Sequence, residues 1–557
     1  MPQIFVSSGR VILVIFLVGI LFISLYVTVI RFSNAQQTQD GIDDKLVSYE
    51  KKSNFIKEFH VPIEERGLRG ITTDSQGNAW FLHSTNETST IVKLEPDSGK
   101  FTQYPEEGET IADNPVINLA AGQLVFDKER NAVWFTDARV NSIGKLDIAS
   151  GQIKLWQVPT KNAGPMGIVL SPEGKSLWFA EIIGNNIARF DIQSEKIVEY
   201  QTGENSGPTL LTFDEKGQLW VSLSFSDSVM LTQIGNLSSN SSVGMVKMSL
   251  PKPDRFAPFG IAIAGGKLYV SDHGSNRVIV ADENSGLQSY DVYWTSSSSS
   301  PALIPTTLPG EVVVDKHGNI FFPQHGGNRI SEIRQDDGLM TEYNIPTGPL
   351  STVLFLTASD DGRVWFTEWA SNKVAYLDTL VKVPFELQVQ QKSIALTKSG
   401  AATLSVSINS ASNATNNSLS LSQIEVGLTG MTESGPTGIT YQANPPRVNL
   451  QDNISIESVI QIQTQENAKP GTYTAMVRIQ APEQDGLVVS RLYPVKVVLN
   501  VPQPTNGQTG ESASNQSSTL FEIRDLVRAI AIAAVVGLVG FIVYRRVKRK
   551  KHAQPED

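Results

Sequence analysis

Polar side chains that could hold a cation recur at one point of a repeated motif. Each copy of the motif is a short apolar strand that starts near an aromatic residue and ends on the polar side chain, followed by a tight turn and, in most copies, an Asn. Carboxylate and imidazole groups at one height around a common axis could bind a hard divalent cation such as Mg²⁺ or Ca²⁺. The predicted metal ligands are His83, Asp137, Glu181, Asp272 and Glu368.

The same position of the motif also gives a predicted ligand-binding set. That set is Asp137, Glu181, Asp272, Gln324, Glu368 and Arg69. The alternative is structural, because each side chain could cap its own turn or bond the Asn that follows it. Those Asn residues are Asn141, Asn186, Asn276, Asn328 and Asn372.

Two neighbouring copies of the motif carry a second group of residues that could bind a ligand or take part in catalysis. The segments 273–277 and 325–329 share His, Gly, Asn and Arg at matched positions. Two imidazoles could face one ligand, and Arg277 and Arg329 could accept an anion. The alternative is a recurring turn with a surface His and an Arg that pairs with a neighbouring acid. The candidate catalytic residues are Glu181, Glu368, His273 and His325.

The spacing of the motif indicates how these residues are positioned. Its first aromatic residues stand at positions 80, 134, 178, 220, 269, 321 and 365, between 42 and 54 residues apart. This period suits one four-stranded propeller blade. The sequence therefore predicts an all-β chain with a seven-bladed β-propeller over residues 54–383. We expect the strand at 55–62 to complete the seventh blade, since the seventh copy has no outer strand of its own.

Composition limits the chemistry that the chain can perform. It has 557 residues, six His, no Cys and a formal net charge of −10. Disulfides, thiolate metal sites and Cys nucleophiles are therefore excluded. An acidic chain also disfavours nucleic acid as a partner and favours cations.

Two apolar segments predict membrane attachment. Residues 11–30 carry no charge and could span a bilayer, so 1–35 is expected to be a transmembrane anchor or a signal peptide cleaved after Ala35. A second transmembrane helix is expected at 525–545, followed by a basic cytoplasmic tail at 546–557. The body of the chain would then lie outside the cell at the cell membrane.

The region between the propeller and the second apolar segment lacks the repeated motif and has another sequence pattern. Alternating apolar residues over 384–500, with the hairpin-like segment 468–477, predict one Ig-like β-sandwich that acts as a spacer. Residues 501–524 form a flexible stalk in this interpretation. Seven Asn-x-Ser/Thr sequons allow glycosylation; they start at Asn86, Asn236, Asn240, Asn413, Asn416, Asn453 and Asn515.

The motif resembles the repeat of the virginiamycin B lyase (streptogramin lyase) family over roughly residues 55–380. The segments 365–374 and 134–143 carry the resemblance most clearly, with Trp-Phe-Thr-Glu or Trp-Phe-Thr-Asp before the turn and its Asn. The resemblance implies a seven-bladed propeller and a magnesium-dependent elimination that opens the ester ring of a cyclic depsipeptide. It also implies a His in a Pro-His-Gly-like turn, where this chain has Arg69, Met166, Thr209 or Phe259.

These observations predict two kinds of function. The first is binding of a small molecule, a glycan or a surface protein at the polar face of the ring, with no nucleic acid involved. The alternative is a metal-dependent lyase, or a related hydrolase, that uses a base other than the family's His, because Arg69, Met166, Thr209 and Phe259 cannot take a proton as His does. A lactonase-like activity is a third possibility, by analogy with other acidic propellers. An enzyme would lose activity with chelator and with Glu181→Gln or Glu368→Gln.

Overall fold

A computed structural model describes residues 46–500 of the chain, apart from several short segments. Those segments are 86–87, 106–109, 112–121, 234–243, 251–255, 286, 411–419, 431–437, 452–453 and 482–488. The two apolar segments, the stalk, the basic tail and the seven sequon Asn residues all lie outside the described residues. Within the described part of the chain, no helix is long and apolar enough to cross a membrane.

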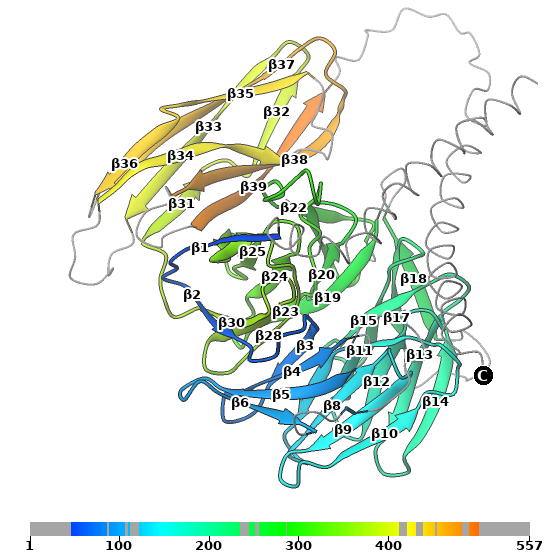
Figure 1. Cartoon of the computed structure of the whole chain (residues 1–557). Helices are drawn as coiled ribbons and strands as arrows, with labels where there is room; N and C mark the ends of the chain where they lie inside the picture. The colour runs from blue at the N-terminus through cyan, green and yellow to red at the C-terminus, as the bar shows by residue number, and fades with distance from the viewer. Residues whose placement is uncertain are drawn as a thin grey trace, which may run out of the picture. The chain divides into compact units, whose positions relative to one another are not determined.

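Seven four-stranded blades make up the larger part of the structure (Figure 1), and the first four follow the chain without interruption. Blade 1 contains β3 (Leu68–Thr73), β4 (Ala79–Ser84), β5 (Ser89–Glu95) and β6 (Lys100–Tyr104). Blade 2 contains β7 (Leu124–Asp127), β8 (Ala132–Asp137), β9 (Ser142–Asp147) and β10 (Ile153–Gln157). Blade 3 contains β11 (Pro165–Leu170), β12 (Ser176–Glu181), β13 (Asn186–Asp191) and β14 (Lys196–Gln201). Blade 4 contains β15 (Pro208–Phe213), β16 (Leu219–Leu223), β17 (Ser228–Thr232) and β18 (Met245–Ser249).

Blades 5 and 6 also consist of consecutive strands, whereas blade 7 takes its outer strand from the region before blade 1. Blade 5 contains β19 (Pro258–Ala264), β20 (Lys267–Asp272), β21 (Arg277–Asp282) and β22 (Tyr290–Trp294). Blade 6 contains β23 (Val313–Val314), β24 (Ile320–Gln324), β25 (Arg329–Ile333) and β26 (Met340–Asn344). Blade 7 contains β28 (Val353–Ala358), β29 (Arg363–Glu368) and β30 (Lys373–Asp378), and its outer strand is β2 (Ile56–His60). The predicted closure by the N-terminal strand is confirmed, since β2 pairs antiparallel with β30.

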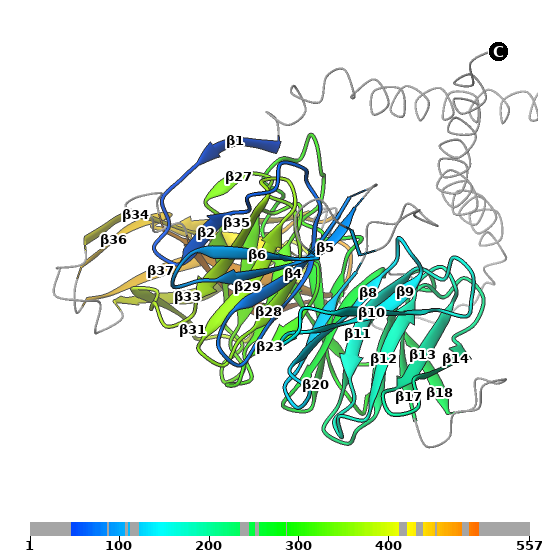
Figure 2. The same ribbon diagram turned by 60° about the horizontal axis from the view of Figure 1, so that its bottom comes forward.

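The second strand of each blade is buried because it lies between two neighbouring blades. Its Trp donates a hydrogen bond from Nε1 to an Asp in the preceding turn in three blades: Trp80 to Asp74 at 2.8 Å, Trp134 to Asp127 at 3.1 Å and Trp220 to Asp214 at 3.0 Å. The aromatic and β-branched residues of the motif therefore fill the space between blades. Figure 2 shows the strands of blades 2 and 3 side by side.

Hydroxyl groups just before the end of the second strand tie each of several blades to the next. Ser222 Oγ donates to the carbonyl of Phe259, Ser271 Oγ to that of Gly310 and Thr367 Oγ1 to that of Arg69, each at 2.6 Å. Thr136 makes the corresponding bond to Met166. The Thr367 bond joins blade 7 to blade 1, so the ring is closed.

A second β domain follows the propeller and shares a sheet with it. One of its sheets contains β31 (Phe385–Val389), β33 (Ala401–Ser410), β37 (Ser455–Thr464) and β35 (Ile439–Asn444). The other contains β32 (Ser393–Thr397), β39 (Val489–Asn500), β38 (Gly471–Gln480), β34 (Ser420–Gly430) and β36 (Arg447–Gln451). The two sheets contribute to one apolar core. Its membership of the Ig-like class stays a prediction.

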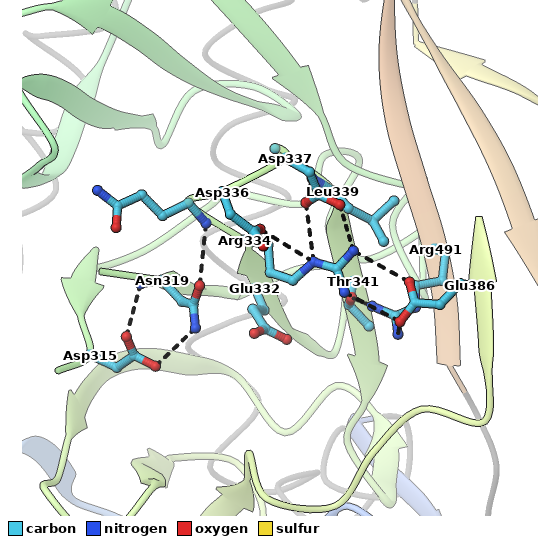
Figure 3. Close-up of polar contacts among 12 residues, drawn as sticks. Asp315, Asn319, Glu332, Arg334, Asp336, Asp337, Leu339, Thr341, Glu386 and Arg491 are labelled. Carbon is cyan, nitrogen blue, oxygen red and sulfur yellow. Dashed lines mark hydrogen bonds and ion pairs between the residues drawn. The ribbon is translucent and has the colours of Figure 1, made fainter. Parts of the chain in front are cut away.

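The shared sheet forms because β39 pairs with β26, the outer strand of blade 6. Arg491 on β39 reaches Thr341 on β26 and Glu386 on β31, and Arg334 after β25 contacts the same Glu386 (Figure 3). Before the propeller, β1 (Val47–Glu50) pairs with β27 (Thr347–Pro349). The outer edge of blade 6 is covered by β39.

Candidate functional site

The six polar residues of the motif occupy equivalent positions in six blades, as their spacing predicts. Each lies at the end of the second strand of its blade or, for His83, one residue before it. Four of them pair with the start of the innermost strand: His83 with Leu68, Glu181 with Pro165, Asp272 with Pro258 and Glu368 with Val353. All six side chains are buried, between 0% and 2% exposed. They therefore share one height in the ring without facing solvent.

Glu181 and Glu368 each lie against a second Glu from the fourth strand of the same blade. Glu181 contacts Glu199 and accepts a hydrogen bond from Asn186 at 2.9 Å. Glu368 contacts Glu58 and accepts one from Ser371 at 2.6 Å. Burial, together with the neighbouring carboxyl, raises the pKa of Glu181 to about 8 and that of Glu368 well above its ordinary value.

Blade 6 shows which group donates in these carboxyl pairs. There Gln324 stands in the place of Glu181, and its Nε2 donates to Glu342 at 2.7 Å. Burial opposes the charge of Glu342, but the cations Arg329 and Arg478 keep its pKa below the ordinary value. A protonated Glu181 would donate to Glu199 in the same way as the Gln324 amide donates to Glu342.

The acceptor of each pair is anchored by the same backbone and hydroxyl donors in all three blades. Thr160 donates to Glu199 through its backbone N–H and its hydroxyl, and Thr347 does the same to Glu58. Ser296 holds Glu342 in this way. The side-chain pair that joins the second and fourth strands is therefore a structural contact repeated in three blades.

The other three motif residues also bond within the fold. Asp137 accepts hydrogen bonds from Ser89 Oγ at 2.7 Å and from the backbone N–H of Arg139 at 3.0 Å. Asp272 forms a buried ion pair with Arg277 at 2.8 Å. His83 Nε2 lies 2.8 Å from the carbonyl oxygen of Glu65, and burial lowers the pKa of its imidazole.

The predicted cation site is not formed by these residues. Across the described part of the chain, no three His, Asp or Glu side chains come close enough together to hold a metal ion. The five predicted ligands, His83, Asp137, Glu181, Asp272 and Glu368, are instead spread around the ring. The structural alternative fits their contacts, because each carboxylate caps a turn or bonds a neighbour in its own or the adjacent blade.

His273 and His325 do come together, and they form the candidate site. Their ring centroids are 6.0 Å apart, and Phe259 lies 4.9 Å from His273. Each follows the last residue of a second strand, in blades 5 and 6, and each is half-buried. Because strand ends in neighbouring blades lie side by side, the matched sequence positions place both imidazoles at one blade junction.

The two imidazoles are neutral and have different free nitrogen atoms. His273 Nδ1 lies 3.0 Å from the carbonyl oxygen of Pro309, which can only accept, so the proton is on Nδ1 and Nε2 keeps its lone pair. His325 Nδ1 is buried and has no hydrogen-bond partner among the described residues. Burial, reinforced by His273, lowers the pKa of His325 to about 4, and burial lowers the pKa of His273 too. The Nε2 lone pair of His273 can therefore accept a hydrogen bond from an organic ligand, and the two rings can stack against it.

The arginines predicted to bind an anion have other partners. Arg277 is held by Asp272. Arg329 donates to Asn344 at 3.2 Å and to the carbonyl of Ser297 at 3.0 Å. Arg69 bonds the carbonyls of Leu68 and Ser84, while its buried Nε has no partner among the described atoms. Anion binding by Arg277 and Arg329 therefore has no support from these contacts.

The Ser-rich segment 296–300 supports the His325 side of the site. Ser298 is buried and donates to the carbonyls of Ile304 and Gly326. A Cβ on Gly326 would meet the Thr306 carbonyl oxygen at 2.2 Å, so only glycine allows this close approach. These hydrogen bonds hold the segment next to His325.

Sequence reasoning missed the fourth-strand partners Glu58, Glu199 and Glu342. Their signal is a Glu followed by Phe or Tyr in the outer strand, which recurs at 58–59, 199–200 and 342–343.

The sequence pattern also assigned the wrong Asn to the motif position of blade 3. Asn185 has a φ of 56° and accepts from the backbone N–H of Gly207, as Asn141 does from that of Gly164, whereas Asn186 bonds Glu181.

The described residues define an all-β protein built on a closed seven-bladed propeller, with an aromatic and imidazole site at a blade junction. The virginiamycin B lyase family matches residues 54–348, just over half of the chain, and the chain belongs to that family. No curated protein sequence matches it.

Two solved structures of lyases with these names are similar to this chain. A streptogramin B lyase shares 23% identity with a TM-score of 0.48, over 58% of this chain and 97% of its own. A catalytically inactive histidine-to-alanine variant of virginiamycin B lyase from Staphylococcus aureus, with quinupristin, shares 22% identity with a TM-score of 0.48, over 58% of this chain and 98% of its own.

Proposed function

We propose that the propeller binds an organic ligand, either a small molecule or a glycan or protein group, at the His273–His325 junction. The observation that carries this proposal is the half-buried imidazole pair beside Phe259. The Nε2 lone pair of His273 offers a hydrogen-bond acceptor, and the partly exposed imidazole rings offer a stacking surface.

The proposed setting is the outer face of a membrane. The apolar segments within 1–35 and 525–545 and the basic tail at 546–557 support it, and the region 384–500 would hold the propeller away from the bilayer. Loops on a rigid ring would then face external ligands.

A metal-dependent lyase is the second candidate, favoured by membership of the family. Among the described residues no cluster of three potential ligands meets, so the magnesium ion that this reaction would require has no preformed multi-ligand site there. His325 is also a weak base at a pKa of about 4, whereas general-base catalysis favours a pKa near the working pH. These two observations favour binding over elimination.

The test uses the full-length protein in detergent, a type B streptogramin and a glycan array. We expect wild type to retain at least one of these probes and the double variant His273→Ala/His325→Ala to bind it at least about tenfold more weakly, which corresponds to about 1.4 kcal/mol. His317→Ala is the matched control, because His317 is exposed on the same blade as His325. Equal binding by wild type and the double variant contradicts the proposed site.

The same incubation separates binding from catalysis. Chromatography follows linearisation of the streptogramin in the presence of magnesium, with and without chelator. Retention without linearisation supports a binding propeller. Chelator-sensitive linearisation would instead establish the lyase reaction.

A further inference from the structure

A cavity of about 350 Å³ lies along the axis of the ring, separate from the histidine site. Its walls are the innermost strands of blades 3 to 6, and the partly exposed side chains that line it include Val169, Thr212, Ile263 and Val313. Pockets of this size hold small organic ligands. Most of the residues that line it are aliphatic, while polar atoms contribute the larger share of its exposed surface.

One carboxyl group faces this cavity. Among the described residues, Glu311 is the only ionisable side chain that lines it. In the inner strands it occupies the position that is glycine in blades 1, 3 and 5, at Gly70, Gly167 and Gly260. Glu311 Oε1 accepts a hydrogen bond from Gln123 Nε2 at 2.5 Å, and Oε2 accepts one from the backbone N–H of Leu356 at 3.0 Å. The contact with Gln123 crosses the axis from blade 6 to blade 2.

Gly70 provides the room for this crossing. A Cβ at that position would lie 2.1 Å from Gln123 Oε1. Gln123 Oε1 in turn accepts the backbone N–H groups of Ile71 and Leu124. The amide is therefore oriented with its NH₂ group toward Glu311 and cannot accept a proton from it.

Glu311 has no counter-charge in the described part of the chain. Neither of its hydrogen-bond donors is cationic, and burial raises its pKa to about 8. A buried carboxylate is costly unless a cation accompanies it. Each carboxylate oxygen accepts one bond from the protein and has capacity for another.

We propose that the axial cavity binds a small organic ammonium, whose charged nitrogen meets Glu311 and whose alkyl chain lies along the aliphatic wall. An isolated carboxylate suits a monovalent ammonium, whereas a divalent metal normally requires several oxygen ligands. The wall of Val, Ile and Leu would bury the alkyl chain. This site is independent of the function proposed for the histidine pair.

Binding should release a proton from Glu311. The carboxyl group is mainly protonated at pH 7, and the ammonium pairs with its ionised form. Affinity should therefore rise about fivefold from pH 7 to pH 8 and level off above pH 9, where alkylammonium is still protonated. No other side chain lining the cavity, within the described part of the chain, is ionisable.

The experiment is calorimetric titration of the full-length protein with n-butylammonium in two buffers that differ in ionisation enthalpy. Wild type should bind and release close to one proton at pH 7. Glu311→Gln should bind at least about tenfold more weakly without proton release, while Glu173→Gln, an exposed change on blade 3, should behave as wild type.

Neutral n-butanol tests whether Glu311→Gln keeps its cavity. It should bind wild type and Glu311→Gln with similar weak affinity. The proposal is overturned if wild type does not bind butylammonium, if butanol binds wild type equally well, or if Glu311→Gln binds butylammonium as wild type does.

Discussion

At the scale of single residues, the clearest result concerns Glu181, which shares a site with Glu199 in blade 3. Its pKa is raised to about 8 in the folded protein, above its ordinary 4.5. A raised acid pKa gives stability that is fully present below the unfolded pKa and is lost as pH rises through the folded pKa. The free energy of unfolding should therefore fall between about pH 4.5 and pH 8, by a few kcal/mol at most.

We expect Glu181→Gln to abolish the fall in the free energy of unfolding between about pH 4.5 and pH 8. The Gln amide would donate to Glu199 as Gln324 donates to Glu342 in blade 6. Urea unfolding should show similar stability at pH 5, and at pH 8 the variant should exceed wild type by about 1–3 kcal/mol. Glu173→Gln, which is exposed on the same blade, should leave the pH profile unchanged. A destabilised variant at pH 8 would contradict a donor role for Glu181.

The sequence predicted where these residues stand but not what they contact. Period and motif were enough to place His83, Asp137, Glu181, Asp272, Gln324 and Glu368 at equivalent strand ends. They could not show that each side chain turns toward its own or the adjacent blade, because that depends on fourth-strand partners such as Glu58 and Glu199. The matched His273 and His325 were found because they share both a motif position and neighbouring blades.

At the scale of elements, closure of the ring depends on β2. Phe59 on this strand lies 6.0 Å from Trp365 and 6.1 Å from Tyr376, between ring centroids. Glu58 on the same strand bonds Thr347 and Lys373. A strand that arrives from the other end of the propeller sequence thus supplies both apolar packing and polar contacts to blade 7.

Phe59→Ala should destabilise the protein by about 2 kcal/mol, less than for a fully buried Phe because Phe59 is only half-buried. Urea denaturation monitored by Trp fluorescence measures this loss. The matched control is Phe225→Ala, since Phe225 is 60% exposed and should change stability by less than about 1 kcal/mol. Equal losses in the two variants would mean that packing by β2 does not hold the ring closed.

Closure was predictable because a missing outer strand and a spare one can both be counted in sequence. The sheet shared by β26 and β39 was not, because the edge of blade 6 has no signal that distinguishes it from the edges of the other blades. The pairing joins residues about 150 positions apart, such as Thr341 and Arg491. Only the spatial arrangement shows that the second domain is attached through a continuous sheet.

At the scale of the whole molecule, the described residues of the propeller and the second domain, within 46–500, belong to one compact unit. Arg491 is buried and donates to the Phe385 carbonyl at 3.2 Å, to Thr341 Oγ1 at 2.9 Å and to Glu386 at 3.0 Å. One side chain therefore links β26 of the propeller to β39 and β31 of the second domain (Figure 3). A spacer role for the second domain requires such a rigid connection.

We expect Arg491→Met to uncouple the two domains. The variant keeps the aliphatic packing of the side chain but leaves Glu386 with only Arg334, so stability should fall by about 2 kcal/mol, less than for a fully buried pair because Glu386 is 31% exposed. Differential scanning calorimetry of the full-length protein should then resolve two transitions where wild type shows one. Arg447→Met removes an exposed ion pair with Glu425 in the same domain and should preserve the single transition. If Arg491→Met still unfolds in one transition at a lower temperature, the backbone pairing of β26 with β39 is itself sufficient to couple the domains.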